Sequence, residues 1–65
     1  MKNSNYGDWE RYKYYVVSDG NMPLQLFLNI NDAMETEELY IDMFNENGEH
    51  IKAICRIDGK YTEDF

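Results

Sequence analysis

The chain has 65 residues, of which 13 are Asp or Glu and 6 are Lys or Arg, so its formal net charge is −7. This length suffices for one small domain and excludes a second core or a cofactor-binding fold of ordinary size. Hydrophobic residues make up 43% and aromatic residues 15% of the sequence. Chains that are disordered by composition contain far fewer, so we expect a single folded domain over residues 1–65.

The hydrophobic pattern and the cysteine content indicate where in the cell the protein is found. No apolar run approaches the ~18 residues that cross a bilayer, and no charged-then-apolar leader opens the chain. The single cysteine, Cys55, cannot form an internal disulfide, which favours a reducing compartment. These features predict a cytoplasmic protein that does not contact membranes.

The first half of the chain is predicted to form an arm and two strands. Residues 1–11 are polar apart from Tyr6 and Trp9, which predicts a loosely attached N-terminal arm whose aromatic side chains can fold back onto the core. Residues 12–18 are rich in aromatic and β-branched types, as is typical of a strand. After the turn residues 19–21, apolar side chains alternate at positions 24, 26, 28 and 30, which indicates a second, antiparallel strand.

The segment that follows admits two interpretations. Asp32 and Glu35 have the spacing of a capping box, so a helix begins there, and it either continues to Phe44 or ends near Glu38. Pairing across a hairpin with a three-residue loop at 46–48 favours the shorter helix. In that register the apolar pairs 39/55, 41/53 and 43/51 fall on one side, and the pairs 38/56 and 42/52 place acids opposite bases on the other.

A further turn at Asp58-Gly59 precedes a short edge strand at 60–62. The predicted fold class is therefore α+β, with the element order β-β-α-β-β. It consists of a small antiparallel sheet of four or five strands and one short helix. The helix and the N-terminal arm are expected to cover one face of the sheet.

Residue types that carry catalysis or bind metals are scarce. One histidine, His50, and one cysteine cannot supply a zinc site, and no glycine lies in the pattern of a calcium loop. Four isolated glycines exclude a glycine-rich phosphate loop. The six basic residues lie near the two ends, which argues against direct binding of nucleic acid. We therefore expect no enzyme activity, no cofactor, no metal and no direct nucleic-acid contact.

The excess negative charge is concentrated in the middle of the chain. Between Lys13 and Lys52 lie eight acidic residues and no Lys or Arg. Acids two apart on a strand are ~6–7 Å apart, and those three or four apart on a helix are about 5–6 Å apart, which is of the order of a phosphate backbone. Such a row could occupy a basic groove that normally takes DNA or RNA, whereas the simpler alternative is that the charge maintains solubility.

The predicted partner-binding residues are the acids of this row and two aromatic residues on the same outward strand face as Asp42, where they add contact area: Asp32, Glu35, Glu37, Glu38, Asp42, Glu46, Glu49, Tyr40 and Phe44. An equally good interpretation of the aromatic pair is a second apolar face, under the helix or at a dimer contact.

The stretch NINDAMETEELYIDMFNENGE, together with the small size, the lone cysteine and the α+β outline, resembles the small acidic inhibitors of phages and mobile elements. This class includes anti-CRISPR and anti-restriction proteins, several of which mimic nucleic acid. The resemblance implies an inhibitor that binds a basic nucleic-acid-handling protein or complex and blocks its DNA or RNA site. If a phage encodes it, the inhibitor acts in the host cytoplasm.

Two other functions fit the same sequence. An antitoxin or immunity protein would neutralise a basic toxin with the same acidic surface. A small-molecule or peptide-binding module would use an apolar pocket lined by Tyr12, Tyr14, Tyr15 and Phe27, although the tyrosines fit better as half-buried strand residues that pack on the arm. A homodimer is a further expectation, because a core of this size rarely supplies more than about 3–5 kcal/mol of stability.

Overall fold

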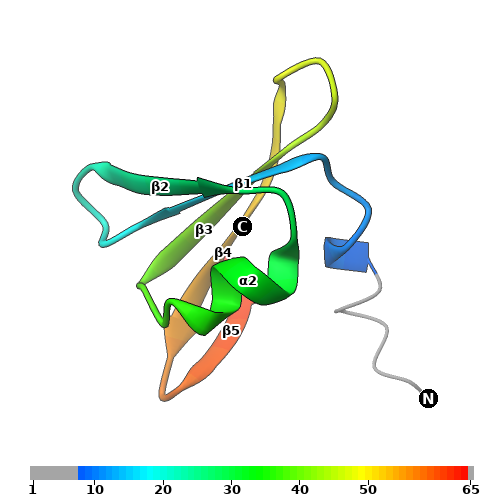
Figure 1. Ribbon diagram of the computed structural model, residues 1–65. Helices are drawn as coiled ribbons and strands as arrows, with labels where there is room; N and C mark the ends of the chain where they lie inside the picture. Colours follow the sequence, from blue (N-terminus) through cyan, green and yellow to red (C-terminus); the bar gives the residue numbers. More distant parts are fainter. Residues whose placement is uncertain (1–7, 65) are drawn as a thin grey trace.

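A five-stranded antiparallel sheet with a short helix on one face makes up most of the structure (Figure 1). This structure is a computed structural model and describes residues 8–64. Its elements are β1 (Tyr14–Ser18), β2 (Pro23–Phe27), α2 (Ile30–Glu35), β3 (Tyr40–Phe44), β4 (His50–Ile57) and β5 (Lys60–Glu63). The predicted antiparallel sheet with one short helix is confirmed, and the chain is largely β. None of the helices in residues 8–64 has the length and apolar character needed to span a membrane.

The order of strands in the sheet is β2-β1-β3-β4-β5, so β2 and β5 are its two edges. β1 and β2 form a hairpin, and β3 pairs with the other side of β1. Because β2 and β3 both run antiparallel to β1, they are parallel to each other, and α2 forms the crossover between them. This crossover places α2 over the sheet (Figure 1).

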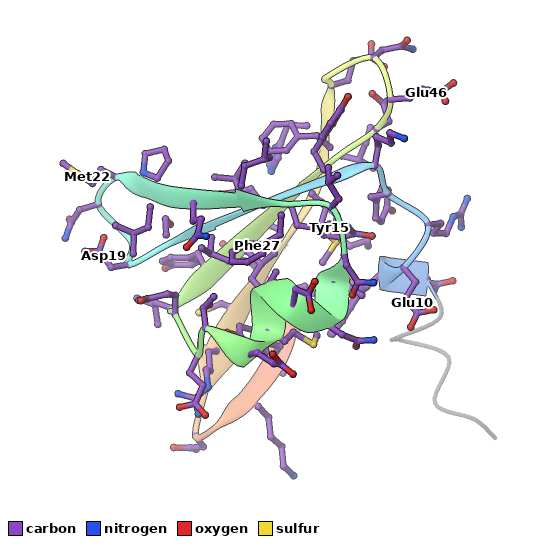
Figure 2. The ribbon with its side chains drawn as sticks, viewed as in Figure 1. Glu10, Tyr15, Asp19, Met22, Phe27 and Glu46 are labelled. Atoms are coloured by element: carbon purple, nitrogen blue, oxygen red, sulfur yellow. The ribbon has the colours of Figure 1, made fainter. Side chains whose placement is uncertain are left out.

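The core lies between α2 and one face of the sheet, which we call the inner face. Strand residues alternate between buried and partly exposed along β1 and β3, as expected for a sheet with a single covered face. Figure 2 shows Tyr15 and Phe27 on the side of the sheet where α2 lies, and the two residues are cross-strand partners. The buried core cluster is Trp9, Tyr15, Val17, Ile30, Ala33, Ile41, Met43 and Ile54.

Trp9 connects the N-terminal part of the chain to this core. Its side chain is only 1% exposed, and its indole nitrogen lies 3.5 Å from the Glu63 carboxylate. The Tyr15 hydroxyl donates a hydrogen bond to the Trp9 carbonyl oxygen at 2.6 Å. The expected folding back of the arm is therefore seen for Trp9, whereas Tyr6 lies outside the described residues.

The predicted start of the helix is corrected. The N-cap is Asn29 and not Asp32, because the Asn29 side chain accepts hydrogen bonds from the backbone N–H groups of Asn31 and Asp32. Asp32 instead lies in the first turn, where a carboxylate interacts favourably with the helix dipole. The shorter helix is correct, since α2 ends at Glu35. The preceding strand is also shorter than predicted: it ends at Phe27, and Ile30 belongs to the helix.

The predicted β3–β4 loop is confirmed, but the strand register is wrong by one residue. Asn45 and Glu49 face each other through a backbone hydrogen bond of 3.0 Å, as the three-residue loop requires. The register then shifts between Met43 and Phe44, which leaves Ile51 as an extra residue on β4.

This bulge reverses the direction of every later β4 side chain, because side chains alternate between faces. Ile54, not Ala53, is opposite Ile41, and Cys55 is opposite Tyr40 instead of Leu39. The predicted acid–base pairs 42/52 and 38/56 are therefore also wrong. The predicted turn at Asp58-Gly59 is confirmed, since both residues have positive φ and join β4 to β5.

We predict that Trp9→Ala lowers the free energy of unfolding by about 3–5 kcal/mol, because it leaves a large cavity in a small core. Urea denaturation followed by far-UV circular dichroism measures this loss. Met22→Ala is the control, because Met22 is 62% exposed, and its effect should stay within about 0.5 kcal/mol. Equal effects of the two substitutions would show that Trp9 does not support the core.

Candidate partner-binding site

The seven carboxylates predicted to bind a partner do not form one row in the structure. Four of them lie on α2 and in the loop after it, Asp42 lies on β3, and the other two lie in the loop between β3 and β4. The five residues of β3 span about 17 Å and separate the first group from the last. In Figure 2, Glu46 lies at the tip of the β3–β4 loop, far from α2. We call the first group, Asp32, Glu35, Glu37 and Glu38, the acidic helix patch.

The two acids of the acidic helix patch that lie on α2 face solvent because the opposite side of the helix is buried. Ile30 and Ala33 belong to the core, whereas Asp32 and Glu35 are exposed. These two acids are three residues apart and therefore neighbours on the helix surface, about 5–6 Å apart between Cβ atoms. Since α2 has six residues and is only about 9 Å long, and the other two acids follow it within three residues, all four acids occupy a short segment.

Hydrogen bonds fix the backbone of the loop after α2. The Thr36 hydroxyl donates to the Ala33 carbonyl oxygen at 2.7 Å and accepts from the Glu38 backbone N–H at 3.3 Å. From β5, the Tyr61 hydroxyl donates to the Glu38 carbonyl oxygen at 2.7 Å. The position of the last two acids is thus set by both the helix end and the sheet.

The protonation of Tyr61 supports this arrangement. Burial raises the pKa of the Tyr61 phenol, Arg56 opposes the rise, and the negative charges of Glu37 and Glu38 add to it. The hydroxyl therefore keeps its proton well above neutral pH and remains a donor to the loop.

Glu37 has an unusual backbone conformation, with φ of 59°, at the position after the helix cap. Glycine is the usual residue there, because the left-handed conformation costs other residues about 1–2 kcal/mol. The Glu37 backbone N–H donates to the Met34 carbonyl oxygen at 3.0 Å, which closes the helix end. Its carboxylate lies 3.8 Å from the Arg56 guanidinium but is 71% exposed, so this ion pair adds little stability.

Acids outside the patch have closer partners. The Asp42 carboxylate lies 3.0 Å from His50 Nε2, and the Glu63 carboxylate lies 3.1 Å from Lys52 Nζ. Among residues 8–64, the pair of Glu37 with Arg56 is the only ion pair that involves a carboxylate of the acidic helix patch. The patch therefore keeps most of its charge available to solvent or to a partner.

The second predicted feature, the aromatic pair on β3, lies on the sheet face opposite α2, which we call the outer face. Tyr40 and Phe44 share this face with Asp42, as predicted, because Ile41 and Met43 point into the core. The Phe44 ring packs at a tilt against His50, with 5.2 Å between ring centroids. The aromatic pair and the acidic helix patch are thus on different faces of the molecule.

The predicted aromatic pocket is not brought together. Tyr15 is buried in the core, Tyr12 and Phe27 pack against the core, and Tyr14 pairs with Phe44 across the sheet. No group of three or more His, Cys, Asp or Glu side chains in residues 8–64 is placed to hold a metal ion. Comparison of the chain with protein-family models, with curated protein sequences and with solved structures gives no match.

Sequence reasoning missed the residues that hold the acidic helix patch in place. Tyr61 is 23 residues from Glu38, and Arg56 approaches Glu37 only because the bulge in β4 turns its side chain toward the inner face. No local motif marks either contact. The one readable signal was Thr36, since Thr near a helix end often bonds to the backbone.

We predict that Glu37→Gly raises the free energy of unfolding by about 0.5–1 kcal/mol, because glycine adopts the left-handed conformation without strain. The matched control is Glu35→Gly, which removes the same charge from a helical position and should lower stability by about 0.5–1 kcal/mol. Urea denaturation of both variants gives the two values. A loss of stability in Glu37→Gly would show that its ion pair outweighs the backbone strain.

A second prediction concerns Glu63. The hydrogen bond from Lys52, assisted by one from Trp9, lowers the pKa of the Glu63 carboxyl. A carboxyl with a lowered pKa in the folded state stabilises the protein above its unfolded pKa, and this contribution disappears as the pH falls through the folded pKa. Glu63→Gln should therefore lower the melting temperature at about pH 7 and have little effect at about pH 2.

Thermal melts at the two pH values test this, and Lys52→Met, which removes the other partner, should show the same pH dependence. An effect of Glu63→Gln that is equally large at both pH values would contradict the assignment of the charge interaction.

Proposed function

We propose that the protein is a small acidic inhibitor that binds a basic nucleic-acid-handling protein or complex and blocks its DNA or RNA site. CRISPR effectors, restriction enzymes and other defence machinery have sites of this chemistry. The observation that carries the proposal is the acidic helix patch, in which four carboxylates lie within seven residues on a hydrogen-bonded segment. Their spacing is of the order of that between phosphates along a strand.

Electrostatic attraction supports this proposal. The chain carries −7 overall, and no Lys or Arg lies between Lys13 and Lys52. A field of this sign attracts a basic groove over several ångströms and accelerates the encounter. The attraction weakens as salt is added, because ions screen exposed charges.

The fixed backbone of the acidic helix patch also supports the proposed inhibitor function. Binding is weakened by the entropy lost when mobile side chains and loops become ordered, and a segment that is already fixed loses less. Glu37 also retains a charged side chain at a position where glycine would relieve strain. Strained residues cluster at functional sites, so a contribution of the Glu37 charge to binding explains why glutamate and not glycine occupies this position.

An antitoxin or immunity protein that neutralises a basic toxin would use the same surface. Competition with nucleic acid separates the two functions: a partner whose DNA or RNA site is covered must release the inhibitor when polynucleotide is added. A toxin that is bound through a surface unrelated to nucleic acid would not release the inhibitor when polynucleotide is added.

The test compares two triple variants that each change the net charge from −7 to −4. The first is Asp32→Asn, Glu35→Gln, Glu37→Gln, which neutralises the acidic helix patch. The matched control is Asp19→Asn, Glu46→Gln, Glu49→Gln, which neutralises acids in the β1–β2 and β3–β4 loops. Proteins captured from a host lysate on the parent chain are identified, and their affinity for the parent and both variants is measured at low and high salt.

We expect the patch variant to bind at least about tenfold more weakly at low salt, since three charge interactions are lost, and the control to bind nearly as well as the parent. Polynucleotide should displace the captured protein from the parent. The proposal is wrong if both variants bind the partner equally well, or if polynucleotide does not displace the partner. Circular dichroism shows that each variant is folded.

A further inference from the structure

The uncharged part of the chain coincides with one edge of the sheet. Residues 20–31 contain no Asp, Glu, Lys or Arg, although charged residues make up 29% of the sequence. This stretch includes β2, which among residues 8–64 pairs only with β1 and leaves its other side open. In Figure 1, β2 lies at the margin of the molecule.

Exposed apolar side chains gather on this edge. Leu24 is 48% and Leu26 56% exposed, and both point to the outer face because their neighbour Phe27 faces the core. Met22 and Leu28, at the two ends of β2, are 62% and 70% exposed. Four of the seven exposed large hydrophobic residues in the described part of the chain therefore belong to residues 22–28.

We infer that β2 is a self-association edge, through which two copies of the chain pair antiparallel to form one continuous sheet. This inference does not depend on the proposed function. An unprotected strand edge presents free backbone N–H and C=O groups that favour pairing with another strand. Proteins that remain monomeric usually place charged residues on such an edge, and β2 has none.

The opposite edge shows the contrast. β5 carries Lys60 and Glu63, and Asp58 and Asp64 flank it, so four charged residues protect that edge from pairing. On β2 the only protective residue is Pro23, at the first position of the strand, where the missing N–H removes one bond at most.

The lack of charge along β2, and not the net charge of the chain, favours a second copy over a basic partner as the occupant of this edge. Two chains of charge −7 repel each other, and an approach through an uncharged edge keeps that repulsion lowest. A basic partner, in contrast, would gain no electrostatic attraction from this edge. Two copies can therefore meet most closely along residues 20–31.

The sequence of β2 also fits pairing with itself. Gln25 is the central residue of Pro23–Phe27, so an antiparallel register centred on it places Gln25 opposite its own copy. Leu24 then lies opposite Leu26 of the partner subunit, and the same contact recurs across the two-fold axis. The exposed leucines would cover each other on the outer face, where such cross-strand pairs are stabilising.

Sedimentation velocity over a protein concentration range from about 10 μM to 1 mM tests the inference, at about 50 mM and 500 mM NaCl. We expect a monomer–dimer equilibrium that strengthens with salt, because screening reduces the repulsion between the copies. Leu26→Lys and Leu24→Lys should each weaken dimerisation at least about tenfold by placing charge on the edge.

The matched control is Ile57→Lys, because Ile57 is 56% exposed, like Leu26, but lies at the end of β4. This variant adds the same charge and should dimerise like the parent. A chain that is monomeric at the highest concentration in both salts overturns the inference, as does a dimer unaffected by either leucine variant or equally weakened by Ile57→Lys. The patch variant described above should still dimerise, so failure of the proposed function leaves this test intact.

Discussion

The structure depends on a core that covers only one face of the sheet. Trp9 and the two buried residues of α2, Ile30 and Ala33, pack against alternate residues of β1, β3 and β4. In a chain of this size the buried fraction of the surface is small, and no second layer covers the outer face among the described residues. The outer face and the β2 edge therefore keep large apolar side chains in contact with solvent.

Much of this fold could be predicted from local patterns. Runs of β-branched and aromatic residues located the strands, and turn residues located the hairpins at Asp19–Asn21, 46–48 and Asp58-Gly59. The hairpin was correctly favoured over a helix that continues to Phe44, although the cross-strand pairs that favoured it are not the pairs in the structure. These signals are local, and they predict the fold well because tight turns join most of the short strands of the sheet.

The features that could not be predicted depend on which face a side chain occupies. Alternation at Leu24 and Leu26 indicates a strand equally well whether the leucines or their neighbours are buried, and here Phe27 faces the core. The bulge at Ile51 leaves no clear mark in the sequence, yet it decides that Ile54 is buried and that Cys55 faces outward. A single extra residue thus altered every predicted pair beyond it.

The candidate site was affected by the same limit. Acids spaced regularly along the chain were expected to form one row, but β3 carries the chain across the sheet and sends its side chains to alternate faces. Only acids 32–38 stay together, because they share a helix and the loop that follows it. Their fixed position relies on Tyr61, a contact between residues too distant in sequence for any spacing rule to detect.

The acidic helix patch and the uncharged β2 edge are related through the symmetry of the inferred dimer. Antiparallel pairing of β2 with its copy keeps the inner faces of both subunits on the same side, because the two-fold axis is perpendicular to the sheet. Both copies of α2, and with them both acidic helix patches, would then lie on one side of the assembly. A dimeric target would meet two patches held at a fixed distance, and linked contacts of this kind exceed the affinity of either alone. Self-association would thus lengthen an anionic surface that is short in the single chain, and it would do so without bringing like charges together at the interface.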